Sequence, residues 1–212
     1  MTIEVIVHVV DDDDGYRVAV SRMLTAAGFN VQSYASGVEL LADLSGDAAT
    51  ERAGCVLADL RMPAIDGLEL QEACRAAGID LPFVFLTGHG DVPSAVSAMQ
   101  RGAVDFLEKD APRHRLLEAL AQAIGRERAE RAARAGREEL KHRFAALTPR
   151  EMEVLALVVR GRMNKQIAAA LGIHERTVKL HRNAITTKLA VRSAAELTTL
   201  TRRAGLFAEQ QG

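Results

Sequence analysis

The stretch IEVIVHVVDDDD at residues 3–14 joins an apolar run to four consecutive aspartates. No basic residue precedes the apolar run, and the acidic cluster closes it, so the pattern predicts a buried β-strand rather than a signal peptide. Asp11 and Asp12 then follow the carboxyl end of that strand directly.

Four more short apolar runs follow along the first half of the chain. They occupy residues 30–35, 55–59, 81–87 and 103–108. Segments with helical spacing lie between them, at 15–27, 36–45, 66–77 and 91–101, and a fifth begins after Pro112. This alternation predicts an α/β fold, a doubly wound five-stranded parallel sheet, in which ligands bind at the carboxyl ends of the strands.

Polar side chains stand at these predicted strand ends. Asp11 and Asp12 follow the first strand, Asp59 closes the third, Thr87 closes the fourth and Lys109 follows the fifth. Clustered carboxylates suit Mg²⁺, and an aspartate can act as a nucleophile toward phosphorus. An ammonium and a hydroxyl group can then bind phosphoryl oxygens, so the pattern indicates phosphoryl chemistry at one pocket.

The second half of the chain is predicted to be all-helical. Residues 113–143 read as one helix that becomes a solvated connector, with an apolar seam too sparse to argue for a coiled coil. Thr148-Pro149-Arg150-Glu151 then forms a helix start with a capping box. Further helices are predicted over about 164–171, 175–189 and 193–204. Two short helices around a glycine-containing turn indicate a helix-turn-helix.

Charge divides along the same line. Residues 1–125 carry nine Lys and Arg against 19 Asp and Glu, a net charge of −10, whereas residues 126–212 carry 18 against nine, a net charge of +9. We therefore predict three regions, 1–125, a helical linker at 126–143 and 144–209. The basic half is a candidate for binding nucleic acid, although such an excess also occurs on a solvated surface.

Composition narrows the class of protein further. The chain has no Trp, and its two cysteines, Cys55 and Cys74, form no metal-binding spacing. No apolar stretch approaches the roughly 20 residues that a membrane-spanning helix needs. We therefore expect a cytoplasmic protein with reduced thiols and no membrane partner.

Four motifs of the first half closely resemble those of receiver domains from two-component response regulators. They are VVDDD at 9–13, DLRMP at 59–63, LTGHGD at 86–91 and GAVDFLEK at 102–109. The resemblance implies a flavodoxin-like fold with Asp59 as the phosphoacceptor. It also implies that Asp12, Asp59 and the backbone carbonyl of Arg61 bind Mg²⁺ or another divalent cation directly, with Asp11 acting through water.

The same resemblance implies a conformational switch. Thr87 would move toward the phosphoryl oxygens, Lys109 would pair with them, and Phe106 would be the switch aromatic. Phe106 also reads as a plain core residue, and Asp13 and Asp14 read more readily as a helix start than as metal ligands.

One position departs from the receiver pattern. Receivers usually carry a proline after the lysine, in a cis peptide, whereas Lys109 is followed by Asp110. A cis bond before a residue other than proline costs about 2.5–4 kcal/mol, so either that peptide is trans or the loop differs. The Asp110 carboxylate could also compete for the Lys109 ammonium.

The stretch LTPREMEVLALVVRGRMNKQIAAALGIHERTVKLHRNAITTKL at 147–189 closely resembles the LuxR-type four-helix DNA-binding domain. Together the two halves resemble NarL/FixJ-type regulators, nearer to the FixJ side. On the third helix, Val178, Ile185 and Leu189 share a face that should be buried. The opposite face carries Arg176, Lys179, Leu180, Asn183 and Thr187.

A helix that presents this opposite face can enter the major groove of DNA. The resemblance implies that Lys179, Leu180 and Asn183 contact bases. The phosphate contacts are expected from Lys165, Arg176, Thr177, His181, Arg182 and Lys188. Any one of these cations could instead be merely solvated, and His181 could be a core-edge histidine.

Two helix starts depart from the LuxR-type pattern. Met163 and His174 stand where serine commonly caps the second and third helices, and each lost cap costs about 1 kcal/mol. Asn164 could cap the second helix one residue later.

The sequence therefore predicts a transcription factor rather than an enzyme. A sensor histidine kinase would phosphorylate Asp59, and the altered receiver would dimerise, free the DNA-binding domain, or both, at a promoter where RNA polymerase acts. Two alternatives remain: a phosphatase-like enzyme using its aspartate on small substrates, and an atypical receiver that works without phosphorylation.

Overall fold

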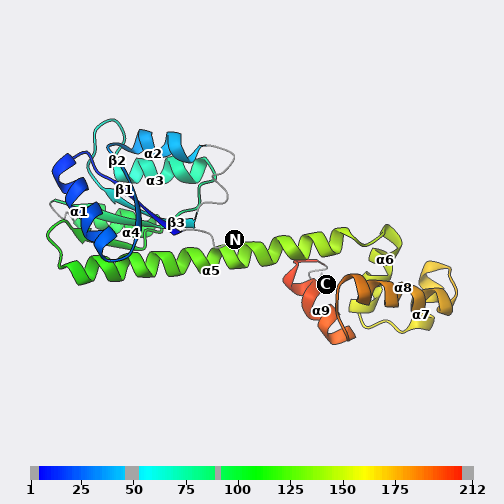
Figure 1. Cartoon of the computed structure of the whole chain (residues 1–212). Helices are drawn as coiled ribbons and strands as arrows, with labels where there is room; N and C mark the ends of the chain where they lie inside the picture. The colour runs from blue at the N-terminus through cyan, green and yellow to red at the C-terminus, as the bar shows by residue number, and fades with distance from the viewer. Residues whose placement is uncertain (1–4, 46–52, 89–91, 207–212) are drawn as a thin grey trace. The chain divides into compact units, whose positions relative to one another are not determined.

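A computed structural model describes residues 5–45, 53–88 and 92–206 of the chain (Figure 1). The chain divides into two compact units, and the boundary falls between Arg131 and Ala132. Each unit is therefore described by itself. The boundaries predicted at 126 and 144 remain a prediction, and the predicted positions 3–4, 89–91 and 207–209 lie outside the described residues.

The first unit contains a five-stranded sheet in which every neighbouring pair of strands is parallel, in the order β2-β1-β3-β4-β5. The strands are β1 (Val5–Val10), β2 (Asn30–Tyr34), β3 (Ala53–Asp59), β4 (Phe83–Thr87) and β5 (Asp105–Glu108). The helices between them are α1 (Asp14–Ala26), α2 (Gly37–Leu44), α3 (Gly67–Ala76) and α4 (Val92–Gln100). The predicted doubly wound parallel sheet is confirmed.

Apolar side chains cover both faces of this sheet. One core joins Val7 and Val9 to Leu24 of α1 and Leu120 of α5 (Arg113–Ala145). The core on the other face packs α2, α3 and α4 against the sheet, with Phe85 fully buried. Because helices close both faces, the carboxyl ends of the strands are where polar side chains can meet a ligand (Figure 1).

Helix α5 is continuous from Arg113 to Ala145, as the sequence predicted for this stretch. Leu116, Leu120 and Ile124 near its start are buried in a core of the first unit, whereas Phe144 at its end belongs to the core of the second unit. No helix within the described ranges is both long enough and apolar enough to cross a membrane.

Both thiols are buried in the first unit. Cys55 lies on β3 and Cys74 on α3, and neither forms a disulfide. Burial raises the pKa of Cys55 to about 12 and that of Cys74 to about 11, so both stay protonated at neutral pH.

The second unit is helical throughout its described elements. They are α6 (Pro149–Val159), α7 (Asn164–Leu171), α8 (Glu175–Lys188) and α9 (Ala194–Arg203). The predicted apolar face of α8 is confirmed, because Val178, Ile185 and Leu189 are fully buried against α6 and α7.

The helix starts of this unit follow the capping chemistry of the sequence. Thr148 and Glu151 form the predicted capping box at α6. Met163 and His174 are the N-caps of α7 and α8, and neither side chain makes a capping hydrogen bond. The suggestion that Asn164 caps α7 is wrong: it lies inside the helix, and its Oδ1 accepts a hydrogen bond from Arg182 at 3.2 Å.

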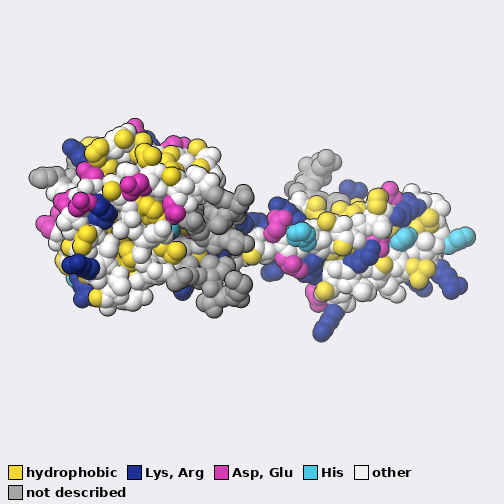
Figure 2. Space-filling view, turned by 45° about the horizontal axis from the view of Figure 1, so that its top comes forward, with side chains coloured by type: hydrophobic (Ala, Val, Ile, Leu, Met, Phe, Trp, Pro, Cys, Tyr) yellow, Lys and Arg dark blue, Asp and Glu magenta, His cyan; other side chains and the backbone are white. Residues whose placement is uncertain are grey.

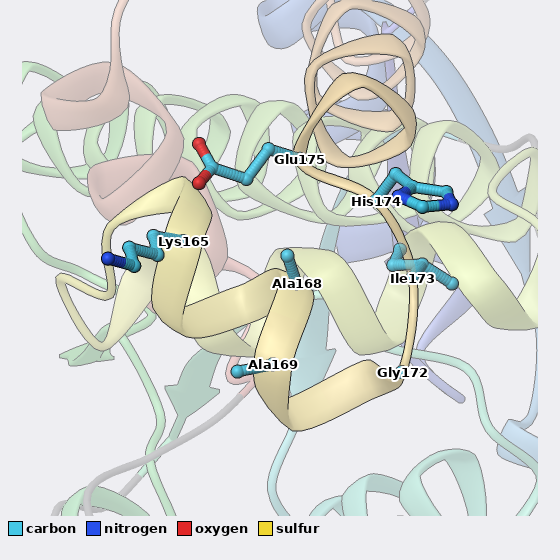
Figure 3. Close-up of a pocket in the computed structure, with 7 residues that line it drawn as sticks. All are labelled: Lys165, Ala168, Ala169, Gly172, Ile173, His174 and Glu175. Carbon is cyan, nitrogen blue, oxygen red and sulfur yellow. The ribbon is translucent and has the colours of Figure 1, made fainter.

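The turn between α7 and α8 requires a glycine. Gly172 ends α7 with a φ of 64°, in the left-handed region that side chains other than glycine rarely adopt. Beside it, the small residues Ala168 and Ala169 leave an open depression of about 460 Å³, with Lys165, His174 and Glu175 among its lining residues (Figure 3). The chain can therefore turn at Gly172 between α7 and α8 without backbone strain.

Candidate functional site

The predicted pocket residues come together at the carboxyl edge of the sheet. Asp11 follows β1, Asp59 ends β3 and Thr87 ends β4, and all three are buried. Asp12 is exposed at the rim of the same pocket. Parallel strand order brings β1, β3 and β4 side by side, so residues nearly 80 positions apart in the chain line one site.

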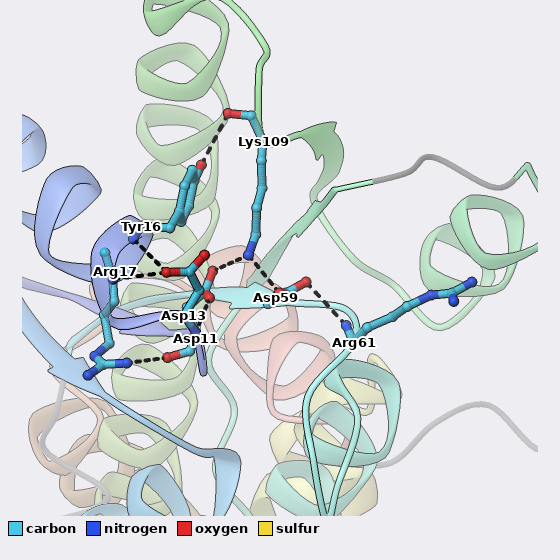
Figure 4. A network of polar contacts seen from close by, with 8 residues as sticks. Asp11, Asp13, Tyr16, Arg17, Asp59, Arg61 and Lys109 are labelled. Carbon is cyan, nitrogen blue, oxygen red and sulfur yellow. Dashed lines mark hydrogen bonds and ion pairs between the residues drawn. The ribbon is translucent and has the colours of Figure 1, made fainter.

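Lys109 joins the two buried carboxylates. Its Nζ lies 2.8 Å from Asp11 Oδ2 and 2.7 Å from Asp59 Oδ2 (Figure 4). The backbone N–H of Lys109 also donates to the Thr87 carbonyl at 2.8 Å, which fixes the lysine at the end of β5. The ammonium therefore lies where a group attached to Asp59 would need a counter-charge.

Burial and hydrogen bonding shift the pKa values of these groups in opposite directions. Burial raises the pKa of Asp11, although hydrogen bonds from Lys109 and from the Asp13 N–H oppose that rise. Burial alone would lower the pKa of Lys109, but its hydrogen bonds to Asp11 and Asp59 outweigh it and raise the pKa overall. Lys109 is thus held in its charged form at neutral pH.

The segment after Asp59 approaches the site closely. The Arg61 N–H donates to Asp59 Oδ1 at 3.2 Å, and the Gly67 N–H donates to the Leu60 carbonyl at 2.9 Å. A Cβ at Gly67 would lie 2.6 Å from the Asp59 carbonyl oxygen and 3.0 Å from the Phe85 ring. Glycine at the start of α3 therefore lets that helix pack directly against the end of β3.

The three aspartates fit a divalent cation. One carboxylate oxygen from each of Asp11, Asp12 and Asp59 lies within 4.8 Å of the other two. Carboxylate oxygens are the hard ligands that Mg²⁺ prefers, and Asp12 keeps the cluster open to water. The donor set and its partial exposure thus match a cation that keeps water ligands.

Helix α1 contributes more to the site than its sequence signalled. Asp13 is the N-cap, accepting from the N–H groups of Gly15 and Tyr16 at 2.9 and 3.1 Å, so the prediction that it starts a helix is confirmed. Those backbone hydrogen bonds lower its pKa. Arg17 donates to the Asp11 carbonyl at 2.6 Å, a contact that sequence reasoning missed because no motif marks it.

The departure at Asp110 leaves the lysine in place. Every peptide bond in the described ranges is trans, including that between Lys109 and Asp110. Asp110 is exposed, while the Lys109 ammonium is paired with Asp11 and Asp59. The trans alternative is therefore the correct one, and among the described residues no contact joins the Asp110 carboxylate to the Lys109 ammonium, whose partners are Asp11 and Asp59.

Phe106 lies partly buried on β5, opposite Phe85 of β4, and packs against the core beneath α4. This placement is compatible with both roles considered for it, core residue and switch aromatic. Thr87 ends β4, the strand next to β3, and is fully buried.

The predicted reading face of α8 is exposed. Leu180 keeps 63 % of its surface accessible, an unusual value for a leucine. The other residues predicted for this face are exposed with it, namely Arg176, Lys179, Asn183 and Thr187. Lys and Arg side chains are prominent on the visible face of this unit, as expected for a surface that meets phosphates (Figure 2).

Several predicted phosphate contacts have partners within the fold. Lys188 Nζ lies 2.7 Å from Glu151 Oε2, and Arg182 donates to Asn164. His181 and Thr177 are half-buried, whereas Lys165 and Arg176 are exposed. Lys188 thus also joins α8 to α6, and the assignment of phosphate contacts stays a prediction.

Replacing Glu151 with Gln is expected to destabilise the second unit by about 1 kcal/mol at neutral pH, because a buried charge-assisted hydrogen bond is lost. The hydrogen bond from Lys188, together with that from the Thr148 N–H, lowers the pKa of Glu151. A carboxyl with a lowered folded-state pKa stabilises above its unfolded pKa of about 4.3 and loses that effect as the pH falls through the folded value.

Calorimetric unfolding of the full chain at pH 7 and pH 3.5 would measure this difference. The difference in unfolding free energy between wild type and Glu151→Gln should be smaller at the lower pH. Glu153→Gln is the matched control on the same helix, because its carboxylate is half exposed and should matter little. A difference in unfolding free energy of equal size at both pH values would contradict the role given to the Glu151 charge.

Comparison with known proteins gives matches over both units. Residues 7–121 match the model for the response regulator receiver domain, and residues 145–201 match that for the bacterial regulatory proteins of the luxR family. Nodulation protein W of Bradyrhizobium diazoefficiens is 38 % identical over 96 % of this chain and 88 % of its own. The transcriptional regulatory protein FixJ of Azorhizobium caulinodans is 39 % identical over 94 % of this chain and 93 % of its own.

A solved structure agrees across nearly the whole chain. The response regulator StyR is 42 % identical, with a TM-score of 0.86, over 94 % of this chain and 99 % of its own.

Proposed function

Since this chain belongs to the response regulators that join a receiver domain to a LuxR-type DNA-binding domain, we propose that Asp59 accepts the phosphoryl group that controls its binding to promoter DNA. The chain is a signalling transcription factor rather than an enzyme. The observation that carries the residue assignment is the Lys109 ammonium held between Asp11 and Asp59 at the end of the sheet.

The transfer step uses Asp59 as the nucleophile. A carboxylate oxygen of Asp59 attacks the phosphorus of a phosphohistidine on the sensor kinase. A P–O bond forms as the P–N bond breaks, and the electron pair stays with the imidazole nitrogen, which takes up a proton. Lys109 then exchanges its contact with the Asp59 carboxylate for one with a phosphoryl oxygen, and Thr87 supplies a hydroxyl donor.

Asp11, Asp12, Asp59 and the backbone carbonyl of Arg61 would hold Mg²⁺ at this pocket. The cation would neutralise the charge that gathers on the phosphoryl oxygens. The chain's own part is to hold these carboxylates close together, and Lys109 helps by offsetting two of their charges.

We assign base reading to Lys179, Leu180 and Asn183, which are exposed along α8. Asparagine can bind adenine with two hydrogen bonds, lysine can donate to guanine, and leucine can contact a thymine methyl. Arg176 and Lys165 would hold the phosphates on either side.

The proposed function requires partners outside this chain. A sensor histidine kinase is the phosphodonor that a receiver domain implies, and DNA is the target that the luxR-family domain implies. We further propose a homodimer on activation, action together with RNA polymerase, and a cytoplasmic location. The dimer would place two α8 helices on two half-sites, as helix-turn-helix proteins generally do.

The intact mass of the protein after incubation with acetyl phosphate and Mg²⁺ tests this proposal. The wild type should gain one phosphoryl group, because Asp59 is buried beside Lys109 and can attack an activated donor. Asp59→Asn should gain none. Asp110→Asn is the matched control, since it makes the same chemical change at an exposed carboxylate beside Lys109 and should keep the uptake.

Size exclusion of the same samples reports the oligomeric state. A larger species in the phosphorylated wild type alone would support the dimer. Uptake by Asp59→Asn equal to the wild type would overturn the assignment of the phosphoacceptor. Failure of the wild type to accept phosphate from both acetyl phosphate and a kinase would favour the atypical receiver instead.

A further inference from the structure

Tyr16 contacts both ends of Lys109. Its Oη donates to the Lys109 carbonyl oxygen at 3.4 Å, and the Lys109 Nζ lies 4.6 Å from the centroid of its ring (Figure 4). The two residues are 93 positions apart in the chain. Tyr16 lies in the first turn of α1, which the Asp13 cap fixes beside the pocket.

The ring gives the ammonium a third neighbour besides its two carboxylates. An ammonium over an aromatic face is attracted by the negative charge density of that face. The Lys109 side chain keeps only 19 % of its surface exposed, so water screens this attraction little. The contact therefore restricts where Nζ can lie while leaving its N–H groups for Asp11 and Asp59.

The phenol anchors the backbone of the same residue. Thr87 holds the Lys109 N–H on one side, and the Tyr16 hydroxyl holds the Lys109 carbonyl on the other. The peptide that follows leads through trans bonds to Asp110, so no proline ring stiffens the chain at this point. Tyr16 thus supplies from α1 a restraint on the Lys109 backbone.

We propose that Tyr16 is a positioning residue that holds the Lys109 ammonium in place for a phosphoryl group on Asp59. This inference rests on the proposed function, because it assumes that Lys109 binds that group. Tyr16 itself touches no reacting atom and acts through Lys109. The competing explanation is that Tyr16 only packs against the core that joins α1 to the sheet.

Calorimetric titration of the full chain separates these explanations. Mg²⁺ is titrated first, and beryllium fluoride, a non-transferable phosphoryl analogue, is titrated at saturating Mg²⁺. Tyr16→Leu should weaken beryllium fluoride binding by about tenfold, because it removes both ring and hydroxyl. Tyr16→Phe keeps the ring and should weaken beryllium fluoride binding by about two- to threefold. Mg²⁺ affinity should stay within about twofold, since the aspartates govern it.

A second set of variants tests whether Tyr16 acts through Lys109. In a Lys109→Ala background, Tyr16→Leu should produce no further loss of beryllium fluoride affinity, because the group it positions is gone. Tyr34→Phe is the matched control, since that hydroxyl bonds to Asp43 on the other side of the sheet and should leave binding unchanged.

Two outcomes would overturn the inference. One is unchanged beryllium fluoride affinity in Tyr16→Leu. The other is an equal loss in the presence and absence of Lys109, accompanied by weaker Mg²⁺ binding, which would show a merely structural role. If the wild type itself bound neither beryllium fluoride nor phosphate, the proposed function would fail, and that result is distinct from a failure confined to the Tyr16 variants.

Discussion

Asn183→Ala is expected to weaken binding to the protein's specific DNA site by about ten- to a hundredfold while leaving the fold intact. Asn183 is exposed on α8, so its truncation removes no core packing. A side chain that reads a base with two hydrogen bonds contributes about 1–3 kcal/mol of discrimination. Binding to unrelated DNA should change little, because that binding comes from phosphate contacts.

DNA selected from a random library by the wild-type protein provides the site for this measurement. Affinities of the wild type and Asn183→Ala would be measured on that site and on forms of it in which an adenine is replaced by another base. The variant should lose its preference at one base position in each half-site. Equal losses on specific and unrelated DNA would contradict base reading by Asn183.

Arg176→Ala gives the contrasting result on the same helix. Its exposed guanidinium is assigned to a phosphate, so its loss should weaken binding to every sequence alike. The slope of log affinity against log salt concentration should fall by about one for each protein copy bound. The two variants together therefore distinguish positioning contacts from reading contacts.

Ile185→Ala is expected to unfold the second unit selectively. Ile185 is fully buried where α8 packs against α6 and α7, and large-to-small truncation at such a site costs about 2–5 kcal/mol. A helical domain of this size has little stability to spare, so its melting temperature should fall by roughly 10 °C or more. DNA binding would be lost with it.

Calorimetry of the full chain would measure this effect, with phosphoryl uptake as a second readout. Uptake should survive, because Asp59 and its neighbours belong to the other compact unit. Leu180→Ala is the matched control, since it truncates an apolar side chain on the same helix at a mostly exposed position. Loss of phosphoryl uptake in Ile185→Ala would show that the two units do not unfold separately.

The order of elements was predictable because hydrophobic periodicity is local. The alternation of apolar runs and helical spacing placed β1, α1 and β3 to within about two residues, and the glycine at 172 marked the end of α7. The capping box at Thr148 was also readable, since its partners lie three residues apart.

Capping at α7 was less predictable. The sequence offered Asn164 as a substitute cap, but the structure uses Met163 without a side-chain bond. The Asn164 oxygen instead accepts from Arg182, which lies 18 residues away. A partner brought close by folding therefore replaced the local contact that the sequence favoured.

The sequence by itself determined which groups stand at the strand ends, because residues that follow parallel strands must meet at one edge of the sheet. It therefore predicted that Asp11, Asp59 and Lys109 line one pocket. Only the tertiary structure decided what surrounds the lysine: the Tyr16 ring lies beneath its ammonium, and Asp110 stays exposed. Such contacts join residues with no fixed spacing along the chain, so they depend on how folding brings the first turn of α1 to the residue that follows β5, which no local pattern encodes.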